Sequence, residues 1–200
     1  MKSHQRSQTS INGCIHFFIE QGLNGEEINV FLNENGVQLK ENENFYLKLA
    51  DSVNVSIDSN ISFSLIGIDP RSTMQKSINN YGCYEPLMVK KILKNVRETD
   101  IVYDIGAHIG YYSSIFNNVT KSKEVVSLEP DFYSTNLIKR NTNERGIVVN
   151  RFIGRELGHN TITLNDLSSM LNLEPSVIKM DIEGFEVEAF EGGWEIIRNL

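Results

Sequence analysis

Residues 101–111, Ile-Val-Tyr-Asp-Ile-Gly-Ala-His-Ile-Gly-Tyr, contain the pattern that decides the fold. An apolar run ends at Asp104 and is followed by a loop with glycines at Gly106 and Gly110. Apolar runs of this kind are typical of strands that are buried on both faces of a parallel sheet. Glycines after such a strand let a ligand approach the backbone before a helix begins. Alone, the pattern is a weak indication of a nucleoside or dinucleotide site.

Strand and helix patterns alternate along the chain from about residue 83. Apolar residues at helical spacing predict a helix over residues 85–96. Such alternation predicts an α/β fold with a Rossmann-like, mostly parallel sheet and helices on both faces. The expected strands are 101–105, 124–128, 147–153 and 177–180. Further helices are expected to begin near Gly110 and near Phe185 and to cover residues 164–173. Another helix is expected to begin with Pro130 as its first residue and to end at about residue 143.

The first 80 residues have a different texture and are rich in Asn, Ser and Asp. Alternating apolar residues on either side of Asp58-Ser59-Asn60 predict a β-hairpin. The polar first ten residues are expected to be disordered. We therefore predict a partly disordered, then β-rich extension over residues 1–80 and a Rossmann-like domain over residues 81–200.

Charge and composition narrow the class of function. The 200-residue chain has a net charge of −7, which argues against a nucleic-acid partner because phosphates require a basic surface. No apolar run is long enough to span a bilayer and no secretory leader is evident, so we expect no membrane partner and a cytoplasmic location. Cys14 and Cys83 are far apart and the four histidines are scattered, so reduced thiols and no metal site are expected.

Three acids fall at the ends of predicted strands, namely Asp104, Glu129 and Asp181. In open parallel sheets, ligands bind beyond the carboxyl ends of the strands. Glu129 lies 25 residues after Asp104, near the place of an acid that accepts hydrogen bonds from two ribose hydroxyls. Alternatively, each acid caps backbone N–H groups at the start of a helix. Asp104 is expected to orient the loop, and the residues expected to line the close approach of the ligand are Gly106, Ala107 and Gly110.

Lys179 interrupts an otherwise apolar strand, where an unpaired ammonium group would cost several kcal/mol. If the strand stays extended as far as Glu183, its period of two places Lys179, Asp181 and Glu183 on one side. These three residues are candidate catalytic groups, because charge clusters at strand ends shift pKa values. A purely structural ion pair is the alternative.

Several segments complete a wider pattern: 84–85, 104–113, 128–131, 136–137 with Asn141, 163–167 and 178–186. In combination, over about residues 81–197, they resemble the FkbM family of S-adenosylmethionine-dependent methyltransferases. The resemblance implies a class I methyltransferase fold with S-adenosylmethionine over the first two strands, and it adds His108 and Pro130 to the cofactor-binding residues. It also implies methylation of a hydroxyl on a sugar or small metabolite, with Asp181 as the base or as the group that places the acceptor.

The resemblance has departures. The family usually has Asn at the position of His108, and its sheet continues after the helix near Phe185, whereas this sequence stops at Leu200. We therefore expect a truncated domain whose fourth strand lies at a bare edge, through which an oligomer could form, unless other strands or a partner cover it. Two alternatives stay open: a non-catalytic binding or scaffold protein with this fold, and an NAD-binding Rossmann enzyme. The methyl acceptor, a small molecule or glycan, is not identified by the sequence.

Overall fold

The structure is a computed structural model that describes residues 15–19, 21–39, 47–121 and 124–200. The chain divides into two compact units, Met1–Glu85 and Pro86–Leu200, slightly beyond the boundary predicted after residue 80. The expected disordered tip lies outside the described residues. Within these ranges, no helix has the length and apolar character needed to cross a membrane.

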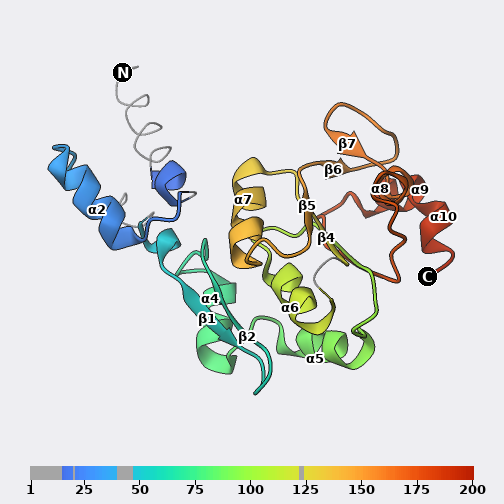
Figure 1. Ribbon diagram of the computed structural model, residues 1–200, viewed down its shortest axis with the longest axis horizontal. Helices are drawn as coiled ribbons and strands as arrows, with labels where there is room; N and C mark the ends of the chain where they lie inside the picture. The colour runs from blue at the N-terminus through green and yellow to red at the C-terminus, as the bar shows by residue number, and fades with distance from the viewer. Residues whose placement is uncertain (1–14, 20, 40–46, 122–123) are drawn as a thin grey trace. The chain divides into compact units, whose positions relative to one another are not determined.

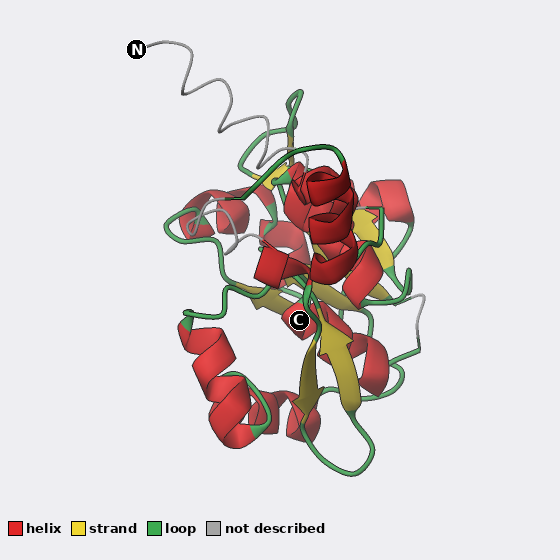
Figure 2. Cartoon of the chain, turned by 90° about the vertical axis from the view of Figure 1, so that its left-hand side faces the viewer, coloured by secondary structure: helices red, strands yellow, loops and turns green. Residues whose placement is uncertain are grey.

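The first unit contains the predicted hairpin. Strands β1 (Val53–Ser56) and β2 (Ser62–Leu65) pair antiparallel and appear in Figure 2 as two neighbouring yellow arrows joined by a loop. The Asp58 carboxylate accepts the backbone N–H groups of Asn60 and Ile61 at 2.7 and 2.9 Å. This side-chain turn reverses the chain at the predicted place.

Helices make up more of the described first unit than strands do, which corrects the expectation of a β-rich extension. These elements are α2 (Gly25–Glu34), the 3-10 helix η1 (Lys48–Ala50) and α4 (Thr73–Tyr81), and residues 15–19 are also helical. Polar residues of this region act as helix caps. Asn24 forms a capping box with Glu27, and the Ser72 hydroxyl accepts the N–H of Gln75.

The second unit is built on a four-stranded parallel sheet. Its strands are β3 (Val102–Ile105), β4 (Val125–Leu128), β5 (Ile147–Val149) and β8 (Val177–Met180), in the order β5-β4-β3-β8. The order therefore reverses between β3 and β8, at the start of the glycine loop. The helices of this unit are α5 (Pro86–Asn95), α6 (Tyr111–Val119), α7 (Phe132–Asn141), α8 (Leu164–Leu171), α9 (Glu186–Gly192) and α10 (Trp194–Ile197).

Helices cover both faces of this sheet, with α6 and α7 on one side and α8 to α10 on the other (Figure 1). Alternate strand residues face different layers. One face contributes Tyr103, Ile105, Val126 and Leu128 to a buried core that includes Leu164 and Leu167 of α8 and Ala189 of α9. The opposite face carries Asp104, with Ser127 and Lys179 as its register neighbours on β4 and β8. The arrangement is compatible with a Rossmann-like fold.

Two predicted elements need correction. The strand expected over 147–153 is two strands, because β6 (Phe152–Ile153) leaves the main sheet and pairs with β7 (Thr161–Ile162). Between them, the Asn150 side-chain amide donates to the carbonyls of Glu129 and Pro130 at 3.0 and 2.8 Å. Pro130 is not the first helical residue, because Asp131 caps α7 by accepting the Ser134 N–H at 2.7 Å.

Strand β8 lies at an edge of the sheet, as expected. Within the described part of the chain, β3 is its only strand neighbour. All four residues of β8 are half-buried, whereas every residue of β3 and β4 is buried. The backbone groups on the outer side of β8 are therefore left without a strand partner in this part of the chain.

Tyr103 is expected to make the second unit sensitive to alkaline pH. Its hydroxyl donates to the Leu173 carbonyl at 2.7 Å. Burial raises the pKa of Tyr103 to about 12, although a hydrogen bond with Ser168 lowers this pKa in part. Because the folded state holds this proton more tightly than the unfolded state, the contribution is complete below pH 10 and is lost as the pH rises from about 10 to about 12. Urea unfolding across this range should show a loss on the order of 2 kcal/mol that Tyr103→Phe lacks. Parallel pH curves for the two proteins would contradict the assignment.

Candidate functional site

The glycine loop after β3 closes onto the carboxyl end of β4. The N–H groups of Gly106 and Ala107 both donate to the Leu128 carbonyl, at 3.0 and 3.1 Å, and the Gly110 N–H donates to the Ala107 carbonyl at 2.8 Å. Helix α6 begins directly after Gly110. The loop therefore lies at the reversal of strand order, where open α/β sheets bind ligands.

The two glycines are required by the packing of the chain on itself. Gly106 has a φ of +75°, and a Cβ there would lie 2.0 Å from the Asp181 carbonyl oxygen. Gly110 has a φ of +84°, and its Cβ would lie 3.1 Å from Cα of Ile138. The group that approaches Gly106 closely is thus the backbone of Asp181, directly after β8. The absence of a side chain at Gly106 lets the ends of β3 and β8 lie together.

Glu129 ties the loop to the start of α7. Glu129 is 8% exposed, and one oxygen of its carboxylate accepts the His108 N–H at 2.8 Å while the other accepts the Asp131 N–H at 3.0 Å. This is the backbone-capping role that the sequence left open. Each oxygen has a second lone pair, so hydroxyl donors fit the chemistry of the group. The ribose-binding role stays a prediction.

Asp104 and Lys179 form a buried ion pair beneath the loop. Lys179 Nζ lies 3.2 Å from Asp104 Oδ1, with side chains that are 17% and 0% exposed. This contact is ionic rather than a well-directed hydrogen bond. The same ammonium group donates to the Gly106 carbonyl at 3.0 Å and lies 5.1 Å from the centroid of the Tyr112 ring. Lys179 therefore links Asp104 to the loop, and the expected role of Asp104 in orienting the loop stays a prediction.

The condition for grouping Lys179, Asp181 and Glu183 on one side, a strand that stays extended as far as Glu183, is not met. Strand β8 ends at Met180, and Glu183 has a φ of +43°, so extended geometry does not reach it. Asp181 and Glu183 have exposed side chains, whereas Lys179 faces its register neighbour Asp104. Lys179 therefore forms an ion pair with Asp104, which is the alternative that the sequence analysis left open.

Buried polar side chains to which the sequence analysis assigned no role support the site. The Ser113 hydroxyl donates to Asp104 Oδ2 at 2.6 Å and accepts the Ser127 hydroxyl at 2.8 Å. The Asn141 side-chain amide donates to the Ile109 carbonyl at 2.7 Å. Ser127 interrupts an apolar strand in the same way as Lys179, which is the pattern that could have revealed it.

The predicted site residues differ in accessibility. Asp104, Ala107, Gly110 and Glu129 are buried, Gly106 and Pro130 are half-buried, and the side chains of His108, Asp181 and Glu183 are exposed. Of the accessible members, His108 lies in the glycine loop after β3, Pro130 follows β4, and Asp181 and Glu183 follow β8. Among the described residues, no three His, Cys, Asp or Glu side chains are grouped so as to hold a metal ion.

No protein-family model and no curated protein sequence matches this chain. The class is therefore defined by the structure: a mixed α/β protein with a four-stranded parallel sheet, flanked by helices, and a glycine loop at the reversal of strand order.

Proposed function

We propose that this chain is an S-adenosylmethionine-dependent methyltransferase related to the FkbM family, and that it methylates a hydroxyl of a sugar or small metabolite. The observation that carries the proposal is the position of Glu129. This acid follows β4 directly and lies 2.8 Å from the backbone nitrogen of His108 in the glycine loop. A carboxylate beside such a loop is suited to the ribose hydroxyls of a nucleoside.

The residues at this edge have distinct roles in the proposal. Glu129 accepts the ribose hydroxyls, and His108 and Pro130 flank the nucleoside. S-adenosylmethionine, when bound, supplies an electrophilic methyl group, and alignment with the acceptor provides much of the acceleration. Asp181, exposed beside Gly106, takes the proton from the acceptor hydroxyl or orients that hydroxyl. Lys179 is a positioning residue in this scheme because its ammonium group is held by Asp104 and Gly106.

Calorimetric titration separates the nucleoside classes. We expect saturable binding of S-adenosylmethionine and of its demethylated product, and no comparable binding of NAD. The loop has one glycine fewer than the three-glycine dinucleotide pattern, which supports this order. Preferential binding of NAD would assign the site to a different Rossmann enzyme.

Asp181→Asn should retain S-adenosylmethionine binding and lose turnover by at least about a hundredfold, because Asn cannot accept the proton. The measurement is transfer of a labelled methyl group to a panel of sugar and small-molecule hydroxyl acceptors. Glu174→Gln, at an exposed acid before β8 that is not among the predicted site residues, is the control and should leave turnover unchanged. Turnover that survives Asp181→Asn would show that Asp181 is not the base.

A non-catalytic binding protein is the second candidate. The observation that favours it is that Asp104, Lys179 and Glu129 all have partners within the chain. A site whose buried charges are satisfied in this way can be stable without a catalytic task. Nucleoside binding without methyl transfer to any acceptor in the panel would favour this candidate.

A further inference from the structure

A line of buried polar side chains crosses the face of the sheet that α6 covers. Ser127 of β4, Asp104 of β3 and Lys179 of β8 are neighbours in register on three adjacent strands. Ser113 of α6 joins them, since its hydroxyl oxygen lies 2.6 Å from Asp104 Oδ2 and 2.8 Å from the Ser127 hydroxyl oxygen. We call these four residues the polar chain. Ser127, Ser113 and Asp104 are at most 2% exposed, so water does not compete for their hydrogen bonds.

The hydrogen bonds of the polar chain point in one direction. The Asp104 carboxylate, as the partner of Lys179, accepts, so Ser113 donates its single hydroxyl proton to Oδ2. Ser127 must then donate to Ser113, which has no second proton to give. Ser127 therefore acts on Asp104 through Ser113.

Ser127 also selects the orientation of Ser113. A serine within a helix can donate instead to the carbonyl four residues earlier. For Ser113 that group is the Ile109 carbonyl in the glycine loop, which already accepts the Asn141 side-chain amide at 2.7 Å. The donor from Ser127 stabilises the orientation in which Ser113 holds Asp104 and leaves the Ile109 carbonyl to Asn141.

The other end of the polar chain holds the glycine loop. Lys179 Nζ lies 3.2 Å from Asp104 Oδ1 and donates to the Gly106 carbonyl at 3.0 Å. The next two loop amides, those of Ala107 and His108, donate to the carboxyl end of β4. Movement of Asp104 would thus carry Lys179 with it and loosen the loop to which these amides belong.

We propose that Ser113 and Ser127 are positioning residues that hold the glycine loop in the geometry needed for ligand binding. They act in series, through Asp104 and then Lys179, and they do not touch the ligand because both are buried. The effect on S-adenosylmethionine binding rests on the proposed function, whereas the effect on the loop does not.

Hydrogen exchange of single amides, followed by NMR, measures the effect on the loop. Ser127→Ala should make the Ala107 and His108 amides exchange about threefold to tenfold faster, because the loop opens more often. The control is Ser168→Ala, on the other side of the sheet, which removes a buried hydroxyl that donates to the Leu173 carbonyl at 2.8 Å. It should leave both amides unchanged. Unchanged loop amides in Ser127→Ala, or equal acceleration in both variants, would overturn the proposal.

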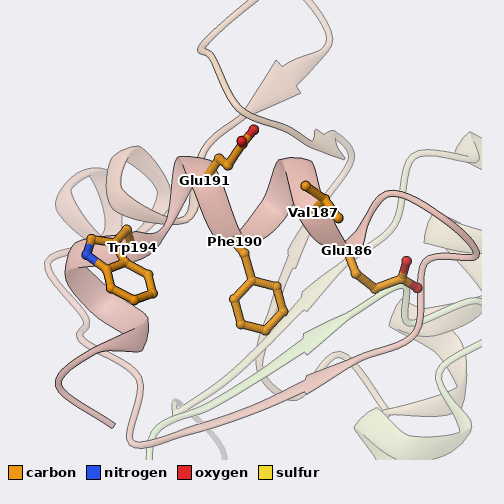
Figure 3. Close-up of a pocket in the computed structure, with 5 residues that line it drawn as sticks. All are labelled: Glu186, Val187, Phe190, Glu191 and Trp194. Carbon is orange, nitrogen blue, oxygen red and sulfur yellow. The ribbon is translucent and has the colours of Figure 1, made fainter.

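Unfolding of the whole unit is measured separately. Trp194 is the only tryptophan of the chain and lies on α10, in a hollow that Phe190 of α9 also lines (Figure 3). Its fluorescence in urea reports on the layer opposite α6, and hence on global unfolding rather than on opening of the loop (Figure 1). Ser127→Ala and Ser168→Ala should both lower the urea midpoint, since each loses a buried hydrogen bond. Loop exchange rates that follow the urea midpoint in the same way for both variants would show a general loss of stability and overturn the proposal.

A double-variant cycle tests the order of the series. Ser113→Ala should accelerate the loop amides at least as much as Ser127→Ala, because it removes the donor to Asp104 itself. Adding Ser127→Ala to Ser113→Ala should change little, since Ser127 then has no path to the carboxylate. If the two factors multiply in the double variant, the serines act independently and the proposal fails.

Calorimetry with S-adenosylhomocysteine, the demethylated product, connects the loop to ligand binding. Ser127→Ala should weaken binding about threefold to tenfold, and Ser168→Ala should leave it unchanged. Full affinity in Ser127→Ala would overturn the role in binding. If the wild-type protein does not bind this ligand, the proposed function fails, and the exchange experiment alone decides whether the serines position the loop.

Discussion

Lys179→Met is expected to destabilise the second unit by about 3–5 kcal/mol. The substitution keeps much of the length of the side chain but leaves the Asp104 carboxylate, which is 0% exposed, without its cation. It also removes the donor to the Gly106 carbonyl. A buried charge without a counter-charge is far more costly than the loss of a surface pair. Urea unfolding of the two proteins measures the difference.

Two further variants make this result specific. Lys91→Met, at an exposed lysine on α5, should change stability by no more than about 0.5 kcal/mol. Combining Lys179→Met with Asp104→Asn should recover part of the loss, because the buried charge is then removed together with its partner. Additive losses in the double variant, or a Lys179→Met variant as stable as the Lys91→Met control, would contradict the ion pair.

Gly106→Ala is expected to cost about 2–5 kcal/mol or to prevent folding of the second unit. The added Cβ would lie 2.0 Å from the Asp181 carbonyl oxygen, which is backbone and cannot rotate away. The φ of +75° adds the strain of a left-handed alanine. Thermal and urea unfolding are the measurements.

Gly184→Ala is the matched control for Gly106→Ala in the same unit. Gly184 also has a positive φ, of +97°, but no atom lies within 4 Å of its added Cβ. This variant should show the conformational strain alone, about 1–2 kcal/mol. Equal losses in the two alanine variants would mean that the loop does not pack against the end of β8 as described.

The sequence predicted the strands of the parallel sheet well, because each signal is local. An apolar run that ends at an acid marks the carboxyl ends of β3, β4 and β8 within a residue or two. The hairpin was equally local, since Asp58 itself forms the turn. The break between β5 and β6 was not predictable from local sequence. It occurs where the Asn150 side chain donates hydrogen bonds to the carbonyls of Glu129 and Pro130, about 20 residues earlier in the chain.

The sequence indicated where the candidate site residues lie along the chain, but not which side chain pairs with which. The spacing between Asp104 and Glu129 placed an acid next to the loop, and the structure has it there. The partner of Lys179 depends on which strand lies beside β8. Strand order is a property of the whole sheet, so a pattern within residues 177–186 favoured Asp181 and Glu183 over Asp104.

The central claim is that Glu129 binds the ribose of an adenosine cofactor, and Glu129→Gln alone does not test it. Glutamine has one acceptor oxygen, so it loses either the His108 or the Asp131 N–H as a donor and disturbs the loop. The test must separate loss through the loop from loss of a ribose contact. Calorimetry with two ligands does so: S-adenosylhomocysteine and its analogue without the ribose 2′- and 3′-hydroxyls.

The measurement is the dissociation constant of each ligand for the wild-type protein and for Glu129→Gln. If Glu129 holds the ribose, the substitution should weaken S-adenosylhomocysteine about tenfold to a hundredfold more than it weakens the dideoxy analogue. Equal weakening of both ligands, or no binding of either ligand by the wild-type protein, would contradict the account.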